Sequence, residues 1–312
     1  MVATDLKKLT KTEKSHGKTF VIVRPGIVAS YYTPSPLGAL APLIADTIER
    51  YMTFVGKGKL ISYVAESGDS KPLTDKRIER DLTMLRKLPK SADGFDLEYS
   101  SEPGAGVGQH AIIVAAHDAD EDFPEQASLV RLEFGEDAIE EFGEKRLIDF
   151  ITAQARALKA QSANTGFGFK RASGFEDEAT AAINAMLPRY LGFDPCYNDA
   201  SDLMGGHTLS AHWLNMIDRA LFERCGGQKA LNANAPEAHV DKKGDIIAIR
   251  SSRLPPIGDR NRKADDVGTV PGVARFLKPT RVPLDGMGDD EFDVEAWLTR
   301  FDDMPNRNWD NG

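Results

Sequence analysis

Cysteine and long apolar runs are scarce in this chain. Its 312 residues include two cysteines, Cys196 and Cys225, which are too few for a disulfide framework and fit a reducing compartment. No run approaches the roughly 18 apolar residues that a membrane helix needs. Residues 1–18 are polar and lack the apolar core of a signal peptide. We therefore expect a cytoplasmic protein that does not contact a membrane.

Familiar catalytic signatures are also missing. The glycines Gly104, Gly106 and Gly108 are not followed by the Lys-Ser pair of a phosphate-binding loop, and no Gly-x-Ser-x-Gly elbow presents a serine nucleophile. The sequence thus predicts no catalytic residue, no metal and no cofactor. One enzymatic alternative stays open. His207 and His212 could hold a hydrolytic metal ion if Asp199 or Asp202 supplied a third ligand.

Negative charge is the clearest positive feature of the composition. The net charge is −9, and residues 285–312 hold nine acidic residues against two arginines, which is −7. A second acidic cluster has no basic residue within it and comprises Asp118, Asp120, Glu121, Asp122 and Glu125. Such patches repel nucleic acid and attract basic partners, although like charge on a solvated surface also keeps a protein soluble.

Apolar periodicity and turn residues predict strands and helices along the whole chain. In the first part we expect a strand, a turn at Pro25-Gly26 and a second strand over 19–32, a helix over 37–55, a helix over 77–88, paired strands over 95–99 and 110–116, and a half-buried strand over 128–134. In the second part we expect a strand over 164–170, helices over 176–187 and 215–225, a hairpin over 240–250, a helix or strand over 270–277, and an amphipathic helix over 293–301.

These elements predict an α+β fold in which antiparallel sheets are flanked by helices. We expect two closely packed halves, residues 1–160 and 161–284, followed by an acidic tail over 285–312 with a short amphipathic helix. In that helix Val294, Trp297, Leu298 and Phe301 form one apolar stripe. The stripe must pack on the protein's own body or on a partner.

The last third of the chain carries a pattern that resembles a known family. A Trp-Leu pair, Trp213-Leu214, precedes a segment that ends in Gly226-Gly227. A Pro-x-x-Gly-Asp-x-Asn-Arg loop and a closing Leu-Lys-Pro follow, at Pro255, Gly258, Asp259, Asn261 and Arg262 and at Leu277, Lys278 and Pro279. Together with Arg24-Pro25-Gly26 near the start, this pattern resembles the immunity-protein family of bacterial type VI secretion over residues 19–281. The acidic tail lies outside the resemblance.

The resemblance implies a non-enzymatic cytoplasmic protein that binds and neutralises a cognate effector toxin encoded next to it. The family's toxins often resemble nucleases, whose surfaces are basic because they hold phosphate, so an acidic inhibitor would gain electrostatic steering. We expect no direct contact with nucleic acid. The expected partner-binding residues are Asp118, Asp120, Glu121, Asp122, Asp289, Asp290, Glu291 and Trp297. The metal-dependent hydrolase, an adaptor of the secretion system and a homodimer remain open.

Overall fold

The structure is a computed structural model that describes residues 6–34, 36–88, 94–117, 126–196, 204–264, 266–283 and 293–307. Within these ranges one twelve-stranded sheet runs through the molecule in the order β11-β12-β10-β8-β2-β7-β6-β5-β3-β4, with β1 paired to β2 and β9 to β8. The pairs are antiparallel except β8–β9. The strands are β1 Lys11–Ser15, β2 Lys18–Thr33, β3 Ser62–Val64, β4 Ser70–Pro72, β5 Gly94–Ser100, β6 Ala111–His117, β7 Ser128–Phe134, β8 Ser162–Arg171, β9 Phe193–Asp194, β10 Leu214–Asp218, β11 His239–Lys243 and β12 Ile246–Arg250.

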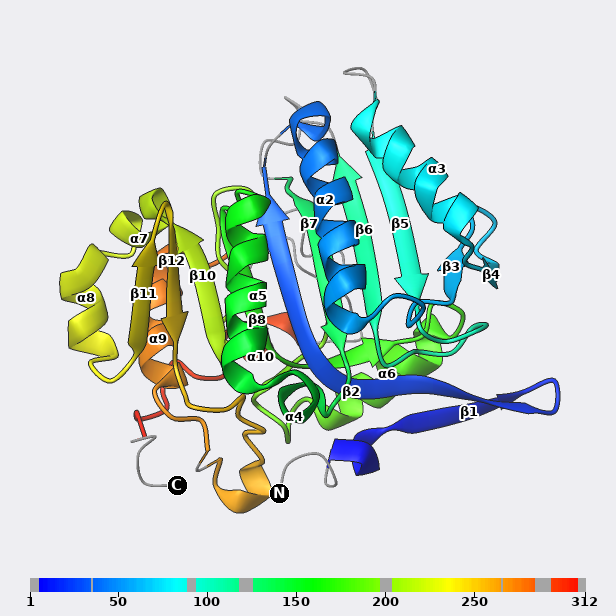
Figure 1. The fold of residues 1–312 in the computed structure, drawn as a ribbon. Helices are drawn as coiled ribbons and strands as arrows, with labels where there is room; N and C mark the ends of the chain where they lie inside the picture. Colours follow the sequence, from blue (N-terminus) through cyan, green and yellow to red (C-terminus); the bar gives the residue numbers. More distant parts are fainter. Residues whose placement is uncertain are drawn as a thin grey trace.

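Helices cover both faces of this sheet, which confirms the predicted α+β class. Figure 1 shows α2, α3 and α5 in front of the strands and α9 and α10 behind them. The helices are α2 Leu37–Val55, α3 Asp75–Arg86, α4 Ala138–Phe142, α5 Glu144–Ala157, α6 Glu176–Met186, α7 Arg219–Arg224, α8 Gly227–Asn234, α9 Val270–Leu277 and α10 Val294–Thr299. None of the helices in the described ranges is both long and apolar enough to cross a membrane.

The predicted turn at Pro25-Gly26 is wrong, because both residues lie inside the single long strand β2. Along one edge of β2 the pairing with β1 ends at Val23 and the pairing with β7 begins at Ile27. Pro25 occupies the interval between these two partners, where a strand tolerates a proline. At Gly26 an added Cβ would lie 2.2 Å from the Phe134 carbonyl oxygen. The glycine therefore permits close approach of the neighbouring strand rather than a reversal of the chain.

The helix predicted over residues 215–225 is also only partly correct. Its first half is the strand β10, which pairs with β8 on one side and β12 on the other. Helix α7 begins after Asp218, whose carboxylate accepts a hydrogen bond from the Leu221 N–H at 2.7 Å and so caps the helix. Strand β10 lies between two strands, and its apolar side chains are buried on the faces of the sheet. This tertiary pairing outweighs the helical spacing.

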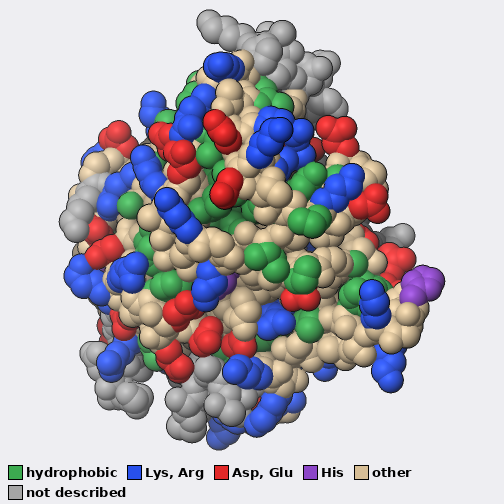
Figure 2. Space-filling view, turned by 45° about the vertical axis from the view of Figure 1, so that its right-hand side comes forward, with side chains coloured by type: hydrophobic (Ala, Val, Ile, Leu, Met, Phe, Trp, Pro, Cys, Tyr) green, Lys and Arg blue, Asp and Glu red, His purple; other side chains and the backbone are tan. Residues whose placement is uncertain are grey.

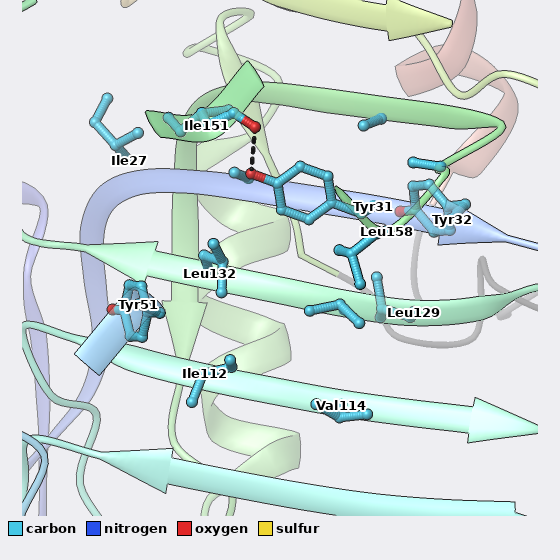
Figure 3. Close-up of a cluster of buried hydrophobic side chains, with 14 of the residues drawn as sticks. Ile27, Tyr31, Tyr32, Tyr51, Ile112, Val114, Leu129, Leu132, Ile151 and Leu158 are labelled. Carbon is cyan, nitrogen blue, oxygen red and sulfur yellow. Dashed lines mark hydrogen bonds between the residues drawn. The ribbon is translucent and has the colours of Figure 1, made fainter. Parts of the chain in front are cut away.

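The buried hydrophobic residues form two clusters, a larger one that includes β7 and a smaller one around α7 and α9. Strand β7 is buried on both faces rather than half-buried as predicted. Figure 3 shows a contact between β2 and α5, in which the hydroxyl of Tyr31 in β2 points toward Ile151 of α5. That hydroxyl donates to the Ile151 carbonyl at 3.1 Å. Strands β2 and β8 pair from Val23↔Arg171 to Tyr32↔Ser162, so the sheet continues across residue 160. The division of the chain into two halves at that point stays a prediction.

Candidate partner-binding surfaces and buried polar sites

Two of the three predicted contact surfaces lie outside the described residues. They are the acidic segments that contain Asp118, Asp120, Glu121 and Asp122 and Asp289, Asp290 and Glu291. Their role as partner-binding residues therefore stays a prediction.

The third predicted surface is the tail helix α10, which packs on the protein's own body. Trp297 is 7% exposed, and its indole Nε1–H donates to the Phe193 carbonyl at 3.2 Å. The Arg300 guanidinium lies 4.2 Å from the centre of the indole ring. The apolar stripe read from the sequence thus anchors the tail to the sheet. Direct contact between Trp297 and a partner stays a prediction.

The charged loop that carries the Gly-Asp-x-Asn-Arg motif is held by internal contacts. Asp259 accepts two hydrogen bonds from the Arg189 guanidinium, at 2.9 and 3.0 Å, and a third from the Asn261 N–H at 3.0 Å. These hydrogen bonds lower the pKa of the Asp259 carboxyl, the one to Arg189 contributing most. Asp266 accepts from the backbone N–H groups of Ile257 and Gly258. Asp259 of the motif therefore ties the loop to Arg189, and Asp266 closes the loop on itself.

The glycine of this motif is required by both backbone conformation and space. Gly258 has φ +63°, and an added Cβ would lie 2.7 Å from the backbone nitrogen of Gly192. Gly192 is equally confined, since its Cβ would lie 2.0 Å from the Pro256 carbonyl oxygen. Backbone approaches this close exclude every residue but glycine. The motif can be recognised in the sequence. Its contact with Arg189 cannot, because Arg189 lies 70 positions upstream of Asp259.

The two histidines of the hydrolase alternative do not form a metal centre in the described residues. His212 is buried, and its Nε2 lies 3.5 Å from the Asp194 carboxylate. Burial lowers the pKa of His212 to about 4, against the opposing effect of Asp194. Within the described ranges no group of three or more His, Cys, Asp or Glu residues is arranged to hold a metal ion. The suggested ligands Asp199 and Asp202 lie outside those ranges.

A buried lysine that sequence reasoning missed ties the glycine-rich loop 102–108 to the sheet. Lys170 in β8 is fully buried, and its ammonium donates to the carbonyls of Gly108, Gln109 and Phe134 at 2.9, 2.6 and 3.2 Å. Burial lowers the pKa of this lysine to about 8, although Glu133 opposes the shift. Because all three acceptors are backbone carbonyl oxygens, we assign Lys170 a role in holding the local fold together.

A groove of about 900 Å³ lies between α2 and α3. Its apolar lining comes from both helices and the strand segment below them, and comprises Met52, Leu60, Ile61, Leu73, Ile78 and Leu82. Five charged residues complete the lining: Glu49, Lys57, Asp75, Glu79 and Arg86. Figure 2 shows this face of the molecule, with hydrophobic side chains gathered between charged ones.

Comparison with known proteins identifies the sequence pattern. The family model TsiV, described as type VI immunity for VRR-NUC, matches residues 43–311. The match extends through the acidic tail, which the sequence patterns had left outside the resemblance. Among solved structures, a T6SS protein of Pseudomonas aeruginosa shares the fold, with a TM-score of 0.75 and 18% identity over 96% of this chain and 90% of that one. Among curated proteins, no sequence matches the chain.

Proposed function

The chain belongs to the TsiV family of type VI immunity proteins for VRR-NUC, and we propose that it protects its cell by binding a nuclease effector. In this proposal the protein acts in the cytoplasm, where the nucleic acid that the effector attacks is found. One immunity protein occupies one effector molecule and performs no chemistry on it. The effector is encoded next to the immunity protein.

The observation that carries this proposal is the family match over residues 43–311. Charge supports it, because an enzyme that holds phosphate presents a basic surface and this chain has a net charge of −9. Opposite charges accelerate the encounter of two proteins and favour the correct partner. The same negative charge disfavours direct contact between the immunity protein and nucleic acid.

Co-expression with the adjacent gene product tests the proposal. The two proteins are produced together, and cell survival and co-purification are scored on the same cultures. Survival with a stable complex is the expected result. Survival without a complex would contradict inhibition by binding and would favour an enzyme that destroys what the toxin makes or needs. Cell death despite folded immunity protein would contradict the assignment of this effector.

A further inference from the structure

The groove between α2 and α3 exposes apolar surface that the described residues leave uncovered. Ile61, in the segment that leads into β3, is 41% exposed. Met52, Leu73 and Ile78 line the same hollow and are only partly buried. Leu60 and Leu82 lie deeper and belong to the main core. The floor of the groove is therefore an extension of the core that reaches solvent.

Charge contacts join the two helices beside the groove. Arg86 of α3 reaches across to α2, where its guanidinium lies 3.2 Å from Asp46 and 2.5 Å from Glu49. Because Arg86 is paired with these two carboxylates, we assign it no contact with a partner.

The remaining charges on the lining are Asp75, Glu79 and Lys57. None of the three makes an ion pair within the described part of the chain. Asp75 and Glu79 are both exposed and stand four residues apart on α3, where two like charges repel. Three acidic residues against two basic ones leave the lining with a net charge of −1. A basic group on a partner would relieve this repulsion.

We propose that this groove is the docking site for an amphipathic segment of the nuclease effector. Apolar side chains of that segment cover Ile61 and the floor around Met52 and Ile78. One lysine or arginine of the segment lies against Asp75 and Glu79. The inference rests on the proposed function, because a basic nuclease supplies the complementary charge.

Two groove substitutions and matched controls test the inference by measuring the affinity for the full-length effector. Ile61→Asp places a charge on the apolar floor and is expected to weaken binding by about tenfold or more, as at a central interface residue. Glu79→Lys removes the anionic contact and is expected to weaken binding by about fivefold, less at high salt. Both side chains are exposed, so the fold should survive.

The controls separate the groove from surface chemistry in general. Met84→Asp changes a 45% exposed side chain on the same helix α3 that does not line the groove. Glu66→Lys makes the same change in net charge at an exposed position outside the groove. Both controls are expected to bind within about twofold of the unaltered protein.

The outcomes distinguish the two levels of the proposal. Loss of affinity in the groove variants with intact binding in the controls supports the docking site. If the unaltered protein binds the effector and the groove variants bind it equally well, the docking site is wrong and the proposed function stands. If the unaltered protein does not bind the effector at all, the proposed function is wrong and the docking site falls with it.

Discussion

Replacement of Asp259 by alanine separates an architectural role of the Gly-Asp-x-Asn-Arg motif from a role in partner contact. The substitution removes the two hydrogen bonds from Arg189 and the cap on the Asn261 N–H. The Arg189 side chain is 47% exposed, so solvent screens the ion pair and its loss adds little. Loss of the cap costs about 1 kcal/mol. The free energy of unfolding should therefore fall by about 1 kcal/mol.

Urea unfolding followed by tryptophan fluorescence measures this difference. Asp259→Asn removes the charge but keeps a capping oxygen, so it should lose less than half as much. Arg262→Ala is the matched control in the same loop. Its side chain is 72% exposed and lies 4.0 Å from Asp259, and its removal should cost less than about 0.5 kcal/mol.

Binding of the effector by the folded Asp259→Ala protein completes the test. If the motif is architectural, the variant is less stable but binds with unchanged affinity at a temperature where it is folded. An Asp259→Ala protein as stable as the unaltered one that no longer binds the effector would refute the reasoning and would make the motif a contact surface.

Three further predictions concern the buried histidine, the tail helix and the acidic segment. Burial lowers the pKa of His212 to about 4 in the folded protein, whereas the unfolded value is about 6.5. Between these two pH values the unfolded chain binds more protons than the folded protein does. The free energy of unfolding should therefore fall as the pH drops from 7 to 5. This loss amounts to about 2 kcal/mol. His212→Gln should remove that part of the pH dependence in urea unfolding, and parallel curves for the two proteins would contradict it. Trp297→Ala should cost about 3–5 kcal/mol and open the tail to limited proteolysis, whereas a tail that stays resistant would show that the indole is not its anchor. Reversing the charges of Asp118, Asp120, Glu121 and Asp122 should slow association with the effector about tenfold at low salt, and an unchanged association rate would remove this segment from the interface.

Local patterns predicted those elements whose signals lie within one segment of the chain. The helix over 37–55 was predicted with the bounds of α2, because its apolar residues recur without interruption between Pro36 and Gly56. The helix predicted over 77–88 overlaps α3, and the Thr74 hydroxyl caps its start by accepting a hydrogen bond from the Arg77 N–H. The hairpin of β11 and β12 turns at Gly244. In each case the residues that decide the structure are neighbours in sequence.

Features that depend on distant contacts were not predicted. Pro25-Gly26 carries the local signature of a turn, and only the positions of β1 and β7 along β2 make it part of a strand. The carbonyl acceptors of Lys170 come from residues more than 30 positions away. The α2–α3 groove depends in the same way on the packing of two helices, since the amphipathic pattern of each shows which side is buried but not the gap left between them. For the same reason an interface is harder to predict than a core.

Titration of the effector's nuclease activity with purified immunity protein tests the central claim most directly. At an effector concentration well above the dissociation constant, cleavage of nucleic acid should fall linearly and cease at one immunity protein per effector, in a complex of the same composition. Complete protection at a small fraction of that ratio, without a complex, would show that the protein acts by turnover and would contradict inhibition by binding.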